Sequence, residues 1–417
     1  MRPGTDFYYY EENGCLLAAV NEYAGLSPAA PHPGERVFFL TERDPVSGRG
    51  SFKAGHPGQL TDPDSLNVLD ASRLEGFPMD AFITEALEEG RLTVVNTGRP
   101  GWKSLLKNAP AGKKRVHILA IGDVGSTLLT GLKLLGGDVI SKIGICDISE
   151  QNLRRWEFEM GQVWLAPPYQ DLFPEVEIVP PERLFDCDVF VFAASKGIPP
   201  VGSQVRDVRM AQFESNAGLV RHYARMARAQ EFRGLWAQVS DPVDPLAKTA
   251  YLESNRDENG TWDGLGLMPE QVQGYGLGVM NARAAYYAKR DERFASFLTE
   301  GRVFGPHGEG LWAADSVDYY DEALSRELTE LTLTANLKMR EMGFKPYVAP
   351  ALSSGALSLL LTLRGEWHCG SVFLDGIYMG CRNRYTPAGI ETELLPAIPD
   401  ALFGHLLEAA AKLRAVL

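Results

Sequence analysis

The sequence predicts an α/β protein in which a doubly wound parallel sheet is followed by an α+β domain and preceded by a smaller α+β appendage. Buried apolar runs alternate with helical segments from about residue 113, which is typical of a parallel sheet covered on both faces. After about residue 246 the pattern changes to longer helices and an antiparallel segment, and residues 1–112 match neither part. We therefore expect three regions, 1–112, 113–245 and 246–417.

Composition excludes several classes of protein. The chain has 417 residues, a net charge of −13 and 45% hydrophobic residues, which allows two or three domains with large cores. The acidic balance argues against nucleic acid as a partner, because phosphate binding needs a basic surface. The five cysteines form no C-x-x-C pair, so we expect neither a disulfide framework nor a zinc site. Since the sequence has neither a signal-like start nor an apolar run long enough to span a bilayer, we expect a cytoplasmic protein without a membrane partner.

The first region is predicted to hold a hairpin, two further strands and one short helix. Asn13-Gly14 is the expected hairpin turn, because it separates two apolar runs and tolerates a left-handed backbone. The other expected elements are strands at 35–40 and 91–95, a helix at 79–88 and a loop over 44–70. No motif indicates a function here. A structural cover over a surface or oligomer contact and a lid or specificity element both stay open.

A strand, a glycine loop and a helix then follow in the order typical of a dinucleotide site. Residues 116–121 are the expected strand and 125–135 the helix, and the loop reads Ala120-Ile121-Gly122-Asp123-Val124-Gly125. Alanine replaces the first glycine of the G-x-G-x-x-G fingerprint. Gly122 still lets backbone approach a pyrophosphate, Gly125 allows close helix–strand packing, and the helix N-terminus offers amides to the phosphates. Asp123 places a carboxylate near that anion.

The ends of two other strands complete the expected cofactor site. Residues 139–146 are the second strand, which Asp147 follows. A carboxylate there accepts hydrogen bonds from a ribose diol and repels a 2′-phosphate, so NAD is favoured over NADP. Ala193, near the end of the buried strand 188–194, is assigned to the same site. A strand–glycine turn–helix that binds no cofactor is the alternative.

Four polar residues follow in a particular order: Arg209, Asp241, Arg283 and His307. With the glycine loop, they make residues 113–417 resemble the lactate/malate dehydrogenase superfamily. The resemblance implies a Rossmann-type doubly wound sheet followed by an α+β substrate domain, NAD as cofactor, a small-molecule substrate, and a homo-oligomer (dimer or tetramer). It also implies that His307 exchanges the proton, that Arg283 binds the substrate carboxylate, and that Arg209 polarises the substrate carbonyl.

The residue types suit these roles. Imidazole titrates near neutral pH and can give and take a proton. A guanidinium binds a carboxylate through two parallel hydrogen bonds, and a cation stabilises oxygen charge that develops during hydride transfer. The loop before Arg209 is longer than the family's, so Lys196, Gln204 and Arg206 all remain candidates for its specificity residue. We assign Arg206 to substrate binding and leave lactate versus malate open.

Two positions depart from the family pattern. Met280 stands where the family has the aspartate that orients the histidine, and Asp241 stands where it has an asparagine. In one account Asp241 becomes the carboxylate partner of His307, and the substrate is larger or less anionic than pyruvate. In the other, catalysis has been lost and dinucleotide binding is kept in a sensor or scaffold. We expect an NAD-dependent dehydrogenase with an atypical site, without a metal, in which His307, Arg209 and Asp241 are catalytic.

Overall fold

The computed structural model describes residues 7–106, 112–169, 172–196 and 208–416, without the side chains of residues 208–211. The strands of this part are β1 (Tyr8–Glu12), β2 (Cys15–Ala19), β3 (Ser27–Pro28), β4 (Val37–Thr41), β5 (Ser51–Lys53), β6 (Leu92–Asn96), β7 (Lys114–Leu119), β8 (Ile140–Cys146), β9 (Glu175–Ile178), β10 (Val189–Phe192), β11 (Leu235–Gln238), β12 (Val272–Gly274), β13 (Arg302–Phe304), β14 (Trp312–Ala314), β15 (His368–Leu374), β16 (Ile377–Thr386) and β17 (Gly389–Thr392). Its α-helices are α1 (Ala81–Glu88), α2 (Asp123–Leu135), α3 (Glu150–Gly161), α4 (Val208–Ala229), α5 (Val243–Ser254), α6 (Leu277–Ala288), α7 (Glu322–Glu341), α8 (Ser358–Arg364) and α9 (Asp400–Arg414).

The central sheet is parallel on one side and antiparallel on the other. Strands β9-β8-β7-β10-β11-β12 pair in parallel, in that order. This is the doubly wound order, which reverses between β7 and β10, and ligands of such sheets bind outside the carboxyl ends of the strands. β12 then pairs antiparallel with β15, and the β15–β16–β17 meander completes nine strands in the described part of the chain. The α/β fold predicted from the sequence is confirmed, and the sheet continues past residue 245.

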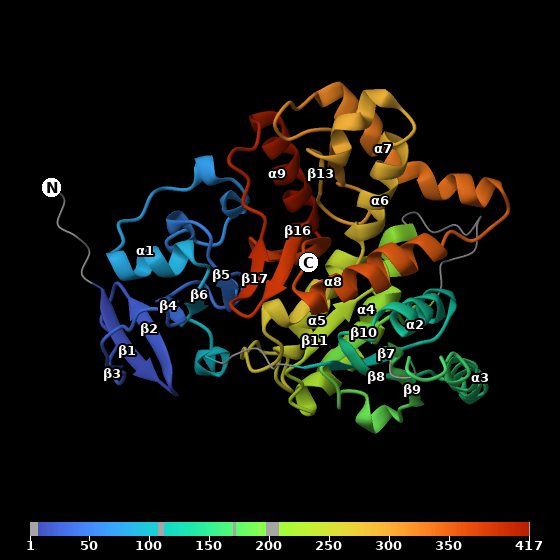
Figure 1. Ribbon diagram of the computed structural model, residues 1–417, viewed down its shortest axis with the longest axis horizontal. Helices are drawn as coiled ribbons and strands as arrows, with labels where there is room; N and C mark the ends of the chain where they lie inside the picture. Colours follow the sequence, from blue (N-terminus) through green and yellow to red (C-terminus); the bar gives the residue numbers. More distant parts are fainter. Residues whose placement is uncertain (1–6, 107–111, 170–171, 197–207, 417) are drawn as a thin grey trace.

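Helices cover both faces of the parallel strands (Figure 1). β10 is buried at every position, because its run Val-Phe-Val-Phe presents an apolar side chain to each face. On one face Leu128 and Leu132 of α2 pack with strand residues and with Leu359 of α8. On the other, α4 and α5 pack around Trp236 of β11. These two layers hold the strand ends, and therefore the loops that follow them, in place.

The N-terminal region folds mainly as its sequence predicts. Its sheet has the order β3-β1-β2-β4-β6-β5, and the β1–β2 turn places Asn13 and Gly14 at φ of 53° and 73°. The prediction of plain loop over 44–70 is wrong in part, because β5 pairs with β6 and short 3₁₀ turns η1 (Pro57–Leu60) and η2 (Leu66–Leu69) follow. These pieces are too short to show a period in the sequence.

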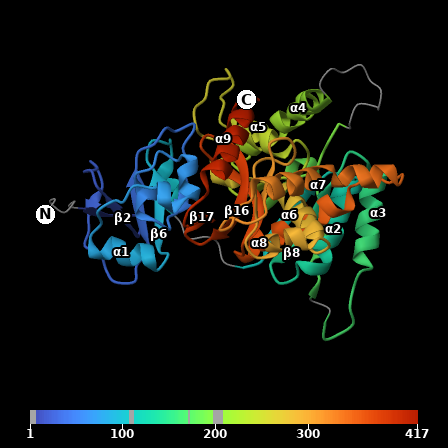
Figure 2. The ribbon, with the colours of Figure 1, turned by 90° about the horizontal axis from the view of Figure 1, so that it is seen from above.

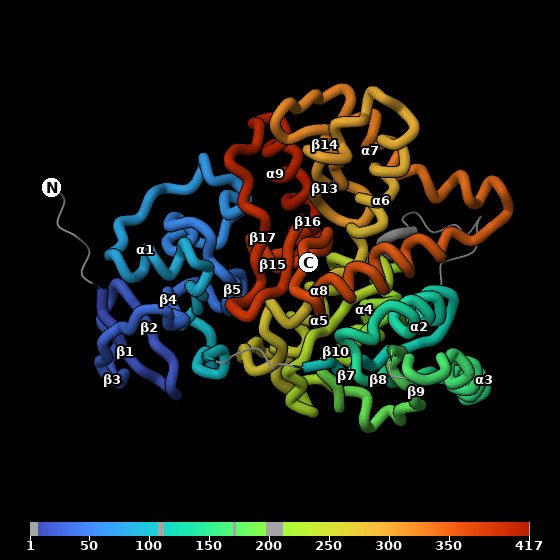
Figure 3. The backbone as a smooth tube through the Cα atoms, in the orientation of Figure 1, coloured from blue at the N-terminus to red at the C-terminus, as the bar shows by residue number. Residues whose placement is uncertain are grey.

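The N-terminal sheet lies beside the C-terminal strands rather than beside the parallel ones (Figure 2). Leu66, Val68 and Leu69 of η2 are buried in a hydrophobic cluster with residues of β15, β16 and α9. The backbone of Asp70 forms a parallel bridge with Leu395. The tube in Figure 3 shows this segment alongside the red C-terminal chain. Residues 66–70 therefore share a core with the end of the chain.

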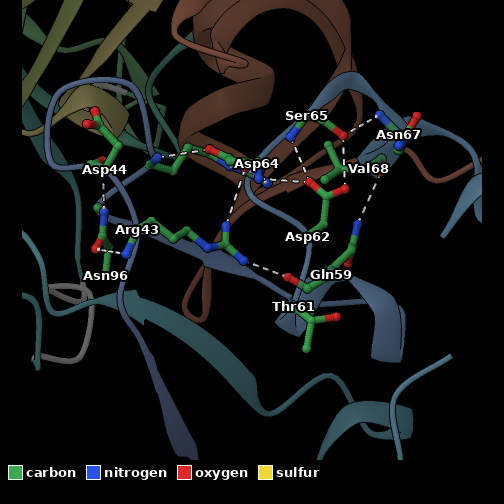
Figure 4. Close-up of polar contacts among 12 residues, drawn as sticks. Arg43, Asp44, Gln59, Thr61, Asp62, Asp64, Ser65, Asn67, Val68 and Asn96 are labelled. Carbon is green, nitrogen blue, oxygen red and sulfur yellow. Dashed lines mark hydrogen bonds and ion pairs between the residues drawn. The ribbon is translucent and has the colours of Figure 1, made fainter. Parts of the chain in front are cut away.

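A buried polar network stabilises the segment between β4 and η2 (Figure 4). Asp64 lies between two arginines, with its Oδ1 at 2.6 Å from Arg49 Nη2 and 3.5 Å from Arg43 Nη1. Arg43 also donates from Nη2 to the carbonyl of Gln59 at 2.7 Å, and its amide donates to Asn96 Oδ1. Burial lowers the pKa of Arg43 to about 10, which Asp64 opposes. One carboxylate thus faces two buried guanidinium groups.

The C-terminal hairpin and last helix differ from the prediction by a few residues. We expect strands at 367–377 and 380–385, but the turn is at Asp375-Gly376, where both φ angles are positive, so Ile377 begins β16. Asp400 is predicted to cap the last helix, but Pro399 holds the cap position and Asp400 is the first helical residue. Within the described residues, no helix is both long enough and apolar enough to cross a membrane.

Candidate functional site

The glycine loop connects β7 to α2 at the carboxyl edge of the sheet. Gly122 precedes α2 and offers no side-chain acceptor to the first helical amides, and a Cβ added to it would meet nothing within 4 Å. A Cβ on Gly125 would lie 2.0 Å from the carbonyl oxygen of Ala120, so glycine is required there. Ala120 takes the left-handed conformation of the missing glycine, with φ of 72°. The loop thus keeps the fingerprint's backbone shape and leaves space in front of Gly122, as a pyrophosphate needs.

Two side chains form hydrogen bonds with the backbone of the glycine loop. Asp147, half-buried after β8, accepts the Ile121 amide on Oδ2 at 2.7 Å and the Ser149 amide on Oδ1 at 2.9 Å. Asn152 of α3 donates to the Ile121 carbonyl at 2.9 Å. Each carboxylate oxygen of Asp147 retains acceptor capacity for a ribose hydroxyl, since it has two lone pairs. The role of Asn152 is not evident from the sequence.

Asp123 forms an ion pair with a lysine that lies far away in the sequence. It begins α2, where a negative charge is favourable beside the helix N-terminus, and Val124 follows it half-buried. Lys345 Nζ, from the segment after α7, lies 2.9 Å from Asp123 Oδ2. The carboxylate that the sequence places awkwardly near an anion site therefore has a cation beside it. Sequence gives no hint of this pair, because 222 residues separate its members.

Asn216 links the loop after β10 to the loop after β11. Ala193 lies against Gly125, with 3.7 Å between its Cβ and a Cβ built on that glycine. Further along the same loop, the Lys196 amide donates to Asn216 Oδ1 at 2.9 Å. The fully buried Asn216 then donates from Nδ2 to the carbonyl of Asp241 at 2.8 Å. Asn216 thus connects the loop after β10, which packs against the glycine loop, to the segment with Asp241.

His307 lies in the loop between β13 and β14. Its Nδ1 is 2.7 Å from the carbonyl oxygen of Gly276, which follows β12, and its Nε2 is 4.0 Å from Asp241 Oδ1. A Cβ on Gly276 would meet the His307 Cβ at 2.6 Å, so only glycine allows this approach. The structure brings His307 and Asp241 together. Asp241 faces the ring nitrogen opposite to the one that the backbone carbonyl holds.

Arg283 of α6 belongs to the same cluster. Its guanidinium donates from Nη1 to Met280 Sδ at 3.5 Å, one turn earlier in the helix. Burial lowers the pKa of Arg283, and the negative charge of Asp241 opposes this. Met280 itself is buried in the hydrophobic cluster of α6. It therefore leaves the imidazole without the carboxylate that the resemblance implies at this position.

Asp244 is a site residue to which sequence reasoning gives no role, although it stands in the same short motif as Asp241. It lies in the first turn of α5, is buried, and accepts the amide of His307 on Oδ2 at 3.0 Å. Burial raises the pKa of the Asp244 carboxyl, while the Ser371 hydroxyl and the His307 amide act in the other direction. Its effect on the site is to fix the backbone of His307.

Several predicted site residues cannot be placed relative to this cluster. Arg206 and Gln204 lie outside the described residues. Arg209 is in the first turn of α4, but its side chain is not among those that the structure describes. Among the described residues, no group of three histidine, cysteine, aspartate or glutamate side chains could hold a metal ion, and all five cysteines are free.

Comparison with solved structures identifies the fold. Neither a protein-family model nor a curated protein matches the chain in sequence. The ligand-bound minor L-lactate dehydrogenase of Enterococcus mundtii is similar with a TM-score of 0.58 and 17% identity, over 73% of this chain and 97% of that one. A lactate dehydrogenase from a Medee basin deep-sea metagenome library gives 0.58 and 16%, over 74% and 98%. The malate dehydrogenase of Aeropyrum pernix gives 0.58 and 17%, over 72% and 96%. This chain therefore has the fold of the lactate and malate dehydrogenases.

Proposed function

We propose that the chain is an NAD-dependent oxidoreductase that transfers a hydride between the nicotinamide and a 2-hydroxy/2-oxo acid or a related compound. The observation that carries this proposal is the convergence of His307, Arg283 and Asp241 at the edge of the sheet where the glycine loop also lies. Binding sites of doubly wound sheets occupy that edge. The solved dehydrogenases of the same fold support this reading.

The described residues fit the cofactor. The open space before Gly122 and the amides of α2 suit a pyrophosphate, and the accessible Asp147 suits a ribose diol but not a 2′-phosphate. Bound NAD would supply the hydride chemistry. The chain's own contribution is orientation and proton exchange: Arg283 holds a carboxylate, and His307 Nε2 takes or gives the proton at the reacting group. Arg209 and Arg206 keep their proposed roles at the substrate, and a dimer or tetramer stays a prediction.

The experiment that tests this function has two stages. Calorimetric titration with NADH and with NADPH measures cofactor binding and the preference that Asp147 is expected to produce. The same protein is then mixed with NADH and a panel of 2-oxo acids, with His307→Gln as the catalytic control. Tight binding of NADH with turnover that the control lacks is the expected result.

Two other results would change the conclusion. Binding of NADH without turnover would favour a sensor or scaffold, for which the loss of the carboxylate at Met280 is the structural argument. Absence of NADH binding would contradict the proposal, and the glycine loop would then be architectural.

A further inference from the structure

Two hydrogen-bond acceptors lie close together in the site. Nδ1 of His307 faces the carbonyl of Gly276, and a carbonyl can only accept, so Nδ1 carries the proton. In the neutral ring Nε2 is then a lone-pair acceptor. Asp241 Oδ1, which belongs to a carboxylate that also only accepts, lies 4.0 Å from Nε2. Beside the neutral ring the two atoms do not bond to each other, and a donor group that lies between them can bond to both.

The backbone segments that carry the two acceptors are held in place by the surrounding structure. Asn216 donates to the Asp241 carbonyl, and the backbone of His307 donates to the buried Asp244. Gly276 has no side chain in the way of the imidazole and receives the Ser354 hydroxyl on the same carbonyl, at 2.8 Å. This arrangement fixes the tautomer of His307 and places the backbone of Asp241 beside the imidazole. A group that lies between the two side chains meets both acceptors.

The spacing suits an amine better than a hydroxyl. A hydroxyl has one proton and satisfies one acceptor, whereas an ammonium or amine nitrogen donates to both. Two N–H hydrogen bonds of about 2.9 Å that diverge at a tetrahedral angle span about 4.7 Å, and the observed separation of 4.0 Å is somewhat shorter. Beside the neutral ring, a ketone oxygen has only lone pairs and would face two acceptors, so it finds a donor at Nε2 only when the imidazole is protonated.

Charge favours the same group. Asp241 is half exposed, so its carboxylate is accessible to a molecule in solution. Burial lowers the pKa of Arg283, and the negative charge of Asp241 opposes that effect. A molecule with a carboxylate for Arg283 and a cation for Asp241 matches both charges. The 2-amino acids have these two groups on one carbon.

We infer that the site oxidises the amine of a 2-amino acid, a step that rests on the proposed cofactor and carboxylate anchor. The ammonium gives one proton to His307 Nε2, which leaves a neutral amine hydrogen-bonded to Asp241. The Cα–H bond then breaks with its electron pair going to NAD⁺, and the nitrogen lone pair forms the C=N bond. The products are the 2-iminium acid, NADH and one proton, and water converts the iminium to the 2-oxo acid and ammonium. In reverse the site reduces a 2-imino acid.

The test compares amino and hydroxy acids of equal side chain. NADH formation from NAD⁺ is followed with the pairs alanine and lactate, aspartate and malate, leucine and 2-hydroxyisocaproate, and phenylalanine and phenyllactate. The variant is Asp241→Asn, which replaces an acceptor-only group by an amide of the same shape. Asp186→Asn is the matched control, since Asp186 has a similar exposure of 55% against 50% but pairs with Arg183 on the surface. Asp241→Ser is a second substitution at the same position. The calorimetric affinity of each variant for NADH shows whether a loss of activity is due to misfolding.

The wild type is expected to prefer the amino acid of at least one pair by kcat/KM. In Asp241→Asn that preference falls about tenfold or more, as for the loss of a hydrogen bond to a charged group, while Asp186→Asn keeps it. Turnover of hydroxy acids alone would overturn the amine inference and leave the proposed dehydrogenase standing. An amine preference that survives Asp241→Asn would also overturn it. Turnover of neither class, with NADH bound, would overturn both.

Discussion

At the scale of single residues, Ala120 is where this chain differs most simply from the dinucleotide fingerprint. Its φ of 72° lies in the left-handed region, which costs a residue with a Cβ about 1–2 kcal/mol. Glycine would remove that strain and would add about 0.5–1 kcal/mol of chain entropy to the unfolded state. The alanine thus keeps the loop's shape at the expense of stability.

We predict that Ala120→Gly raises the free energy of unfolding by about 0.5–1 kcal/mol. Urea denaturation of both proteins measures the difference. Ala120→Val is the matched control and is expected to destabilise, because a β-branched side chain tolerates this φ least. A glycine variant less stable than the parent would show that the alanine methyl group makes contacts worth more than the strain.

The residues of the site differ in how far sequence could predict them. His307, Arg283 and Asp241 stand at motif positions, and the structure brings them together. The acceptor at Nδ1 could not be predicted, because a backbone carbonyl such as that of Gly276 leaves no mark in a sequence. A role for Asp244 could have been predicted, because a carboxylate at the start of an apolar helix needs a hydrogen-bond donor once it is buried.

At the scale of elements, the pair of Lys345 and Asp123 connects the segment after α7 to the first turn of α2. Both side chains are largely exposed, so their attraction is screened and acts mainly on charges nearby. The pyrophosphate proposed to bind at α2 would be such a charge. Lys345 then balances the negative charge that Asp123 adds to the phosphate site.

We predict that Lys345→Gln weakens NADH binding about two- to fivefold and that Asp123→Asn strengthens it by a similar factor. Calorimetric titration at low and high salt measures both, and the two effects should shrink as salt rises. Arg364→Gln is the control, because Arg364 forms a similar exposed pair with Asp138 at the other end of α2. An unchanged affinity in Lys345→Gln would separate this lysine from the cofactor.

A second element-scale consequence concerns His368 at the start of β15. The ring is buried, its Nε2 is 3.1 Å from Thr362 Oγ1, and burial lowers its pKa from 6.5 to about 4. Between those values the unfolded chain binds the proton more readily than the folded one, so stability falls as the pH drops below 6.5. The buried carboxyls Asp244 and Glu270 have raised pKa values and act in the opposite direction.

His368 is expected to lower the free energy of unfolding by about 2 kcal/mol between pH 7 and pH 5. Because other groups titrate in the same range, the measurement is the difference between the parent and His368→Gln, each unfolded in urea at both pH values. The loss of stability should be smaller in the variant by that amount. Equal losses in the two proteins would mean that the folded protein admits a charged imidazole at this position.

Long elements with a clear hydrophobic pattern could be predicted from the sequence, and the short elements could not. The strands and helix around the glycine loop follow from a continuous apolar run and a helical spacing, and their observed bounds agree within a few residues. β5 has three residues in a stretch rich in glycine and proline, so pairing with β6 rather than local pattern decides it. The predicted hairpin turn lies a few residues after the observed one at Asp375-Gly376, because Ile377 is apolar and continues the pattern of the strand before it.

At the scale of the whole molecule, the first hundred residues are packed into the C-terminal core. Leu69 is 1% exposed and lies in one cluster with residues of β15, β16 and α9. Arg99 connects the region to α5 as well, with its Nη1 2.7 Å from the Tyr251 hydroxyl. The predicted division at residue 112 marks a change in the sequence pattern, but residues on both sides of it share one hydrophobic core.

We predict that Leu69→Ala costs about 2–5 kcal/mol, as for a large-to-small change in a core. Its effect should extend to β15 and β16, whose amides are expected to exchange hydrogen faster in the variant. The control is Leu134→Ala on α2, where the side chain is 46% exposed and a change within about 0.5 kcal/mol is expected. Unaltered exchange in β15 and β16 would show that residues 1–112 unfold independently.

The bridge between Asp70 and Leu395 also has a consequence for biosynthesis. The carboxylate of Asp70 accepts the amide of Ile398, which is 328 residues further along the chain. At about 5–20 residues per second, a ribosome needs roughly 15–65 seconds to make that length. Throughout this interval Leu66, Val68 and Leu69 lack the partners that bury them. The newborn chain therefore carries an apolar segment without its final partners for most of its synthesis.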